Sequence, residues 1–126
     1  MILNLTQHNA TKDQINAGIV DLPAEFKTAL VGAITFPATY TKSDLERKAR
    51  QVLEVVRDYH GSEVAKTASV MIGGMPSFMP VLERVLSEYG IKVGYACTER
   101  KSVDKEVDGK IIKTAVFVHA GMYWAN

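Results

Sequence analysis

The chain has a single cysteine, Cys97, and almost no excess of charge of either sign. One cysteine cannot form a disulfide within the chain, so the fold must be stabilised by its core. This is usual in the reducing cytoplasm, where we expect this protein. A formal net charge of +1 excludes the strongly basic surface typical of proteins that bind duplex nucleic acid. A small anionic ligand bound locally stays compatible with that balance.

Membrane and targeting segments are also missing from the 126 residues. No apolar run approaches the roughly 18 residues of a membrane-spanning helix. Residues 1–5 lack the basic region that opens a signal peptide. Internal repeats, low-complexity segments and linkers are absent as well, so we expect one compact domain over residues 1–126.

The sequence also lacks the common motifs for cofactors and metals. The glycine pair at 73–74 is followed by neither the Rossmann glycine spacing nor the Gly-Lys-Ser/Thr of a P-loop. His60 and His119 stand far apart without the spacing of metal ligands. We therefore expect no metal and no cofactor.

What the sequence does contain is an alternation of short apolar runs with helical patterns. Apolar runs at 2–5, 69–72 and 91–97 predict buried strands, and residues 19–22 predict either a short strand or an extended connection. Residues 34–36 predict one more extended piece. Helices are expected from Thr11, which forms a capping box with Gln14, from Pro23, from the capping box at 43–46 to His60, and from Ser77 to Tyr89.

The C-terminal part carries a hairpin signal. Asp108-Gly109 lies between the strand-like runs 103–107 and 110–118, and Asp-Gly is a preferred two-residue hairpin turn. Together these patterns predict an α/β fold. It would have a Rossmann-like, mostly parallel sheet flanked by helices and a C-terminal antiparallel β-hairpin.

The segment from Ser69 to Phe78 combines a buried strand, two glycines and the start of a helix. Such a junction presents free backbone N–H groups and the positive end of the helix dipole, which suits a phosphate or a carboxylate. We expect Gly73, Gly74, Met75 and Ser77 to bind a ligand there. The alternative is that the glycines make only a tight turn.

Polar residues follow two further strand ends, and in a parallel sheet these ends share one edge with the glycine turn. Thr6, Gln7 and His8 follow the first strand, and the third strand ends at 98–101. Gln7 and Thr98 are suited to read a base or a ribose, with Thr6 beside them. His8 is a candidate acid or base, or else a loop histidine that bonds its own backbone.

The cationic candidates for that edge are Arg100 and Lys101. A guanidinium grips phosphate bidentately, and an ammonium acts as a mobile point charge. The alternative is that both are solvated or paired with Glu99. Cys97 is expected to be a small core residue.

Several stretches together carry a family resemblance. They are residues 2–8, the glycine turn at 73–74, the run 90–100 with its Tyr-Ala-Cys-Thr-Glu-Arg ending, and the hairpin from 107 to 117. In these stretches the chain resembles the small stand-alone CRISPR-associated proteins with a CARF-like Rossmann domain, and their phage and bacterial relatives. Some members of that group cleave cyclic oligoadenylate second messengers and are called ring nucleases.

The resemblance implies a metal-independent reaction in which a ribose 2′-hydroxyl attacks the adjacent phosphate. His8, Arg100 and Lys101 would then be the catalytic residues. A symmetric cyclic ligand would suit a homodimer. Two alternatives stay open from the residues: a nucleotide sensor or sponge that does not cut, and an accessory interaction protein without a ligand.

Overall fold

A five-stranded sheet with the order β2-β1-β3-β4-β5 organises the chain, and the computed structural model describes residues 1–126. The strands are β1 (Ile2–Asn4), β2 (Ile19–Asp21), β3 (Ser69–Met71), β4 (Lys92–Val107) and β5 (Lys110–Trp124). β1, β2, β3 and β4 are mutually parallel, and β5 is antiparallel to β4. The predicted α/β class, the parallel strands and the C-terminal hairpin are confirmed.

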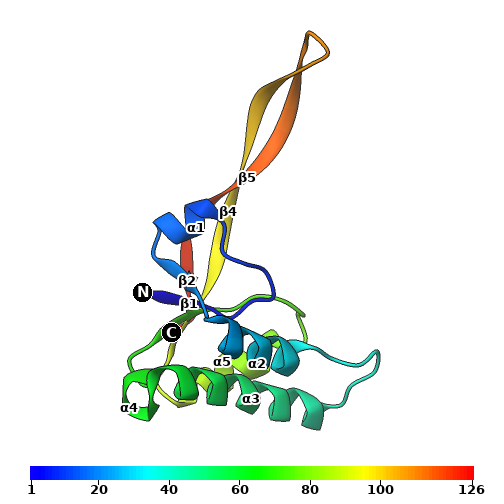
Figure 1. Cartoon of the computed structure of the whole chain (residues 1–126). Helices are drawn as coiled ribbons and strands as arrows, with labels where there is room; N and C mark the ends of the chain where they lie inside the picture. Colours follow the sequence, from blue (N-terminus) through cyan, green and yellow to red (C-terminus); the bar gives the residue numbers. More distant parts are fainter.

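The helices are α1 (Lys12–Asn16), α2 (Ala24–Ile34), α3 (Lys42–His60), α4 (Ser62–Ala65) and α5 (Met79–Glu88). α3 packs between α2 and α5, and the three gather on one side of the sheet (Figure 1). The apolar stripe of α3, including Ala49, Val52 and Val56, is fully buried against the strands. This burial against the sheet face that carries Leu3 and Val70 forms the core.

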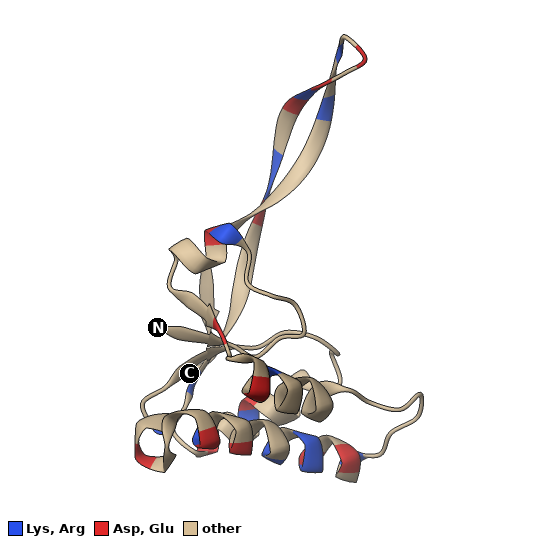
Figure 2. Ribbon diagram, in the orientation of Figure 1, with Lys and Arg blue, Asp and Glu red and all other residues tan.

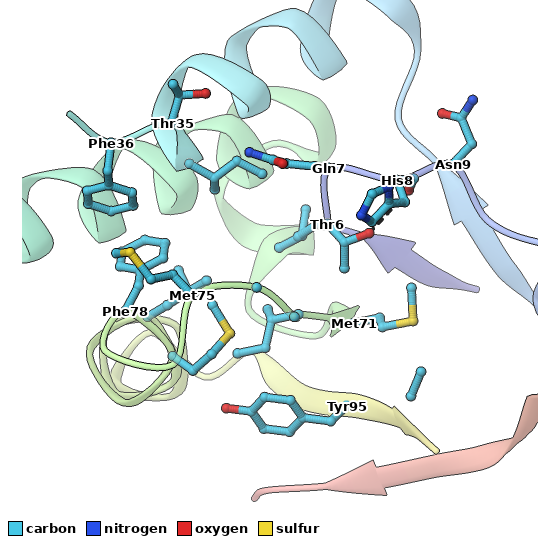
Figure 3. A pocket seen from close by; sticks show the side chains of 18 of the residues that line it. Thr6, Gln7, His8, Asn9, Thr35, Phe36, Met71, Met75, Phe78 and Tyr95 are labelled. Carbon is cyan, nitrogen blue, oxygen red and sulfur yellow. Dashed lines mark hydrogen bonds between the residues drawn. The ribbon is translucent and has the colours of Figure 1, made fainter. Parts of the chain in front are cut away.

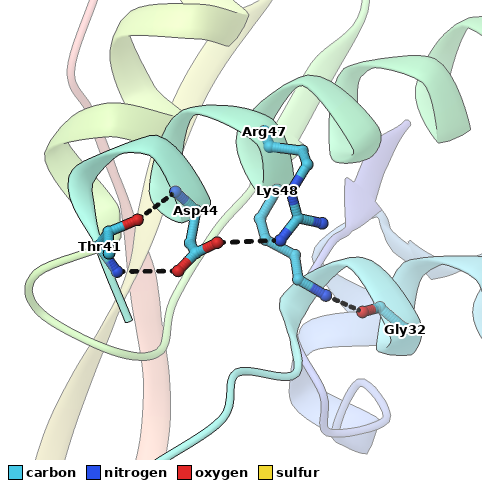
Figure 4. A network of polar contacts seen from close by, with 5 residues as sticks. All are labelled: Gly32, Thr41, Asp44, Arg47 and Lys48. Atoms are coloured by element: carbon cyan, nitrogen blue, oxygen red, sulfur yellow. Dashed lines mark hydrogen bonds and ion pairs between the residues drawn. The ribbon is translucent and has the colours of Figure 1, made fainter. Parts of the chain in front are cut away.

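The start of α3 corrects the predicted capping box at 43–46. Thr41 is the N-cap: its hydroxyl accepts from the Asp44 amide, and the Asp44 carboxylate accepts from the Thr41 amide at 2.8 Å (Figure 4). The bond from the Thr41 backbone, with help from Arg47, lowers the pKa of Asp44. Lys48 of α3 reaches α2 by donating to the Gly32 carbonyl at 2.9 Å. The helix therefore begins two residues earlier than the predicted box would place it.

Several further boundaries differ from the sequence predictions. α5 begins at Met79 rather than at Ser77, because residues 76–78 form a separate turn. Residues 35–36 are not a strand; Thr35 is the C-cap of α2. The four-residue helix α4 after Gly61 was not predicted. The Thr11 capping box is confirmed, and of the two possibilities for residues 19–22 the strand is the one formed, over Ile19–Asp21. The helix predicted from Pro23 begins one residue later, with Pro23 as its N-cap.

β4 and β5 are much longer than the sequence predicted. β4 continues through residues 98–101, which we expected at a strand end, and turns at Asp108-Gly109 with φ values of 52° and 76°. Both angles are positive, as a two-residue hairpin turn requires. We call residues 98–119 the arm, because this part of the hairpin projects from the rest of the molecule (Figure 1). Cys97, at the arm's base, is exposed and not a core residue.

On the sheet face away from α3, Gly94 of β4 lies under the side chain of Trp124. A Cβ at Gly94 would fall 2.6 Å from that indole ring. The ring also receives the Lys92 ammonium at 4.4 Å from its centre. Only glycine therefore leaves room for the Trp124 ring at this position.

None of the five helices is both long enough and apolar enough to cross a membrane.

Candidate functional site

A pocket of about 880 Å³ opens at the carboxyl edge of the parallel strands (Figure 3). Its walls come from the segments after β1 and β3, from the connection between α2 and α3, and from the first turn of α5. The lining includes Thr6, Gln7, His8 and Asn9 on the first segment, Phe36, Pro37 and Tyr40 on the connection, and Gly73, Gly74, Met75, Phe78 and Tyr95 on the remaining walls. The pocket therefore lies at the sheet edge where the sequence analysis expects a ligand.

The pocket has an apolar side and a polar side. Phe36 and Phe78 pack edge to face with ring centres 4.9 Å apart, and Met75 lies beside them (Figure 3). Across from them lie the loop residues Gln7 and His8. No lysine, arginine, aspartate or glutamate belongs to the lining, so its polar character comes from amides, hydroxyls and one imidazole. Aromatic and thioether walls with few polar groups are typical of sites for planar organic ligands.

The loop that carries His8 is held by Asn4, the one fully buried polar residue of the chain. The Asn4 amide group donates to the His8 carbonyl at 2.7 Å and to an Asp21 carboxylate oxygen at 2.8 Å. Its carbonyl oxygen accepts from the Thr6 amide at 3.0 Å and the Thr6 hydroxyl at 2.7 Å. Asp21 also accepts from the Ala10 amide at 3.0 Å. All four hydrogen-bonding positions of the Asn4 side chain are therefore used to fix this wall.

Sequence reasoning missed the role of Asn4. The only available signal was a polar residue at the end of an otherwise apolar strand, directly before Thr6. A buried polar side chain is costly unless it is fully bonded, so its presence in a strand indicates a network.

The glycine turn presents backbone N–H groups that no atom of the chain accepts. The amides of Phe78 and Met79 donate to the Met75 carbonyl, whereas those of residues 73, 74, 75 and 77 make no hydrogen bond within the chain. Gly74 has φ = 145°, which a residue with a side chain rarely adopts. The Ser77 hydroxyl lies 2.6 Å from the Tyr40 hydroxyl and so links the turn to the α2–α3 connection.

Tyr95 closes the pocket on the β4 side. Its hydroxyl donates to a carboxylate oxygen of Glu83, on α5, at 2.8 Å. Burial, followed by the hydrogen bond to Glu83, raises the pKa of Tyr95 to about 12. The phenol therefore stays protonated at neutral pH and remains a donor.

The structure brings together six of the ten predicted site residues in the pocket lining: Thr6, Gln7, His8, Gly73, Gly74 and Met75. Ser77 lies next to the lining through its contact with Tyr40. Thr98, Arg100 and Lys101 are exposed on the arm and do not line the pocket. Of the three polar segments that we expected at this edge, the loop after β1 and the glycine turn line the pocket, and residues 98–101 do not.

The structure therefore defines an α/β protein with a pocket at the carboxyl edge of a mostly parallel sheet. The chain belongs to the Uncharacterized protein MJ1673 family, whose model matches residues 1–122. No curated protein and no solved structure matches the chain.

Proposed function

We propose that the pocket at the carboxyl edge binds an anionic nucleotide of the cyclic oligoadenylate class. The observation that carries this proposal is the pairing of an aromatic wall with a turn of unbonded amides in one cavity of about 880 Å³. This volume lies within the range of roughly 300–1,000 Å³ found for small-molecule sites.

Such a ligand contains phosphate groups and purine bases, and these two kinds of group suit the two sides of the pocket. A phosphate accepts well from backbone N–H groups near a helix start, and the lining residues 73, 74 and 75 have such groups without a partner in the chain. A purine has a flat apolar face, which suits the half-buried ring of Phe36 and the half-buried thioether of Met75. Phe78 is itself buried and contributes by packing against Phe36. Gln7 lies opposite with an amide that can both donate to and accept from a base edge.

The lining supports binding more directly than it supports cleavage. Charge stabilisation of a transferred phosphate normally uses arginine, lysine or a metal, and the lining has none of these. Arg100 and Lys101 of the same chain lie outside it. We therefore propose a binding protein, a sensor or sponge, as the first function, working in the cytoplasm.

A second candidate is cleavage of the bound ligand, favoured by the place of His8 in the lining. In that reaction a ribose 2′-hydroxyl attacks the adjacent phosphorus while the phosphorus–O5′ bond breaks. The products are a 2′,3′-cyclic phosphate and a 5′-hydroxyl. His8 would accept the proton of the 2′-hydroxyl, or donate one to the leaving oxygen.

Thermal unfolding with cyclic tri-, tetra- and hexa-adenylate, and with AMP as a small control ligand, tests binding. A ligand at 100 times its dissociation constant stabilises the fold by about 2.7 kcal/mol, which is a clear rise in the unfolding temperature. The variant Gly73→Ala should reduce this rise, because its methyl group would occupy space in the pocket lining beside the turn. Its Cβ meets only the Thr6 methyl at 3.5 Å, so the fold tolerates it.

The matched control is Gly32→Ala, a helical position with open space around the added Cβ and no part in the lining. It should respond to the ligand as the unmodified chain does. Chromatography of the incubated ligand, with His8→Ala for comparison, separates binding from cleavage. If no cyclic adenylate shifts the unfolding temperature, the proposal is wrong and an interaction protein without a ligand remains.

A further inference from the structure

The arm leaves one edge of β4 without a partner. β3 pairs with β4 only from Lys92 to Gly94, while β5 covers the opposite edge of β4 as far as Val107. Beyond Gly94 the outer edge of β4 therefore carries unpaired N–H and C=O groups along the whole arm. A lone two-stranded ribbon is marginally stable in water, and an open edge is a template for pairing with another strand.

The arm also exposes large apolar side chains. Ile111 is 74% exposed and Phe117 is 71% exposed, and Val103, Val107, Ile112 and Val116 are exposed as well. No helix layer covers this part of the hairpin (Figure 1). Exposed apolar side chains gathered on one projecting element indicate an interaction surface.

The charges on the arm are of both signs and unpaired. Residues 98–119 contain five basic and four acidic residues, and none of them forms an ion pair within the chain. Figure 2 shows them interspersed along the hairpin. The acidic residues lie on β4 and in the turn, whereas β5 of the arm contributes only Lys110 and Lys113. A surface with charges of both signs does not suit a polyanion. Because β4 of the arm carries both acidic and basic residues, two copies of β4 can place opposite charges against each other.

We propose that β4 of the arm pairs with β4 of a second copy of the chain. The pairing is antiparallel, with a two-fold axis at Ser102, and gives a four-stranded sheet with the order β5-β4-β4-β5. Opposite residues are then those whose numbers are symmetric about 102. Glu99 lies opposite Lys105 of the partner subunit, and Arg100 lies opposite Asp104 of the partner subunit. By symmetry each ion pair occurs twice.

The neighbouring registers are less favourable. An axis at Val103 places Arg100 opposite Glu106 of the partner subunit but also Lys101 opposite Lys105 of the partner subunit, so a like-charge pair offsets each ion pair. An axis at Lys101 forms no ion pair. An axis between two residues is excluded, because opposite residues of the ladder point to the same face of the sheet and successive residues alternate faces. Like charges directly opposite each other destabilise a ladder, so the charge pattern selects the axis at Ser102. This interface uses the arm alone and stands whether or not the pocket binds a nucleotide.

A charge swap at positions 99 and 105 tests the register. These positions face Val118 and Ile112 across their own hairpin, so reversing their charges meets no charged partner across that ladder. Glu99→Lys or Lys105→Glu alone creates two like-charge pairs and should raise the dissociation constant of the dimer about tenfold or more. The double variant Glu99→Lys with Lys105→Glu restores opposite charges and should return it close to its original value.

Sedimentation equilibrium of the full chain at several concentrations measures these constants. Lys110→Glu is the matched control: it makes the same charge change on β5, away from the proposed edge, and should leave the dimer unchanged. A chain that stays monomeric at all concentrations overturns the proposal. So do single reversals that weaken the dimer no more than Lys110→Glu does, or a double variant that fails to restore it.

A cross-link gives a second test that does not depend on affinity. Directly opposite residues of an antiparallel pair have Cα atoms about 4.5–5.5 Å apart, which lies within the range for a disulfide. With Cys97→Ala in the background, Ser102→Cys should form a covalent dimer when copper-phenanthroline and air oxidise the two thiols. Ala115→Cys, opposite Ser102 on β5, is one strand further from the axis and should not. Equal cross-linking of both variants overturns the proposed axis.

Discussion

Asn4→Asp is expected to destabilise the fold strongly, although it changes one NH₂ group to an oxygen. At neutral pH the introduced carboxylate would face the His8 carbonyl and the Asp21 carboxylate, which now accept from Asn4 at 2.7 and 2.8 Å. The two N–H groups of the Asn4 amide are thereby lost, and the carboxylate oxygen in their place faces two other oxygen acceptors. At about 1–3 kcal/mol for each such group, the expected loss is roughly 3–5 kcal/mol. That is a large share of the roughly 5–15 kcal/mol by which a domain is stable.

The loss should depend on pH in a defined direction. Burial and the neighbouring Asp21 raise the pKa of the introduced carboxyl above the value of about 3.9 that it has in the unfolded chain. A protonated carboxyl can again donate one hydrogen bond. The variant should therefore be closest to the unmodified chain at pH values near 4 and below, and should lose stability as the pH rises through the raised pKa.

Urea unfolding followed by circular dichroism at several pH values between 4 and 8 measures this effect. Asn9→Asp is the matched control, because it makes the same chemical change in the same loop on an exposed side chain. If Asn4→Asp and Asn9→Asp unfold at the same urea concentration at pH 7, the Asn4 network does not hold the loop and the reasoning fails.

Two further predictions concern β4 and its neighbours. Gly94→Ala should lower the free energy of unfolding in urea by about 1–3 kcal/mol, because its Cβ would fall 2.6 Å from the Trp124 ring. The control Gly32→Ala should raise it by up to about 1 kcal/mol through helix propensity. Equal effects of the two variants would contradict the proposed clash with Trp124. In ultraviolet titration the Tyr95 phenol should ionise near pH 12, and Tyr95→Phe should abolish that late step. Because this pKa is raised on folding, its contribution to stability is complete below about pH 10 and lost as the pH rises to 12. A Tyr95 that ionises near pH 10 would contradict the role of burial.

The sheet could be predicted because its signals are local. Apolar runs at 2–5, 69–72 and 91–97 are separated by helical patterns, and strands connected through helices run parallel in one sheet. The Asp108-Gly109 turn is equally local, since two positive φ values select these residue types. The length of β4 was underestimated because residues 98–107 lack a buried face, and the apolar alternation that marks a strand depends on burial.

The part of the pocket lining that follows the strand ends could also be predicted from local signals. The position of a strand end follows from topology, so Thr6, His8 and Gly73 were correctly expected at one edge. Phe36 and Tyr40 reach the pocket from the α2–α3 connection, whose path depends on tertiary packing that sequence periodicity does not report. Arg100 was expected in the pocket because β4 was expected to end before it.

The projecting arm also changes how the molecule moves in water. A compact body with a long ribbon attached has a higher frictional coefficient than a sphere of the same 13.9 kDa mass. A single chain should therefore elute early in gel filtration and tumble slowly and anisotropically. An apparent mass calibrated with globular standards would overestimate that of a monomer, so elution volume by itself is a misleading guide to the number of chains.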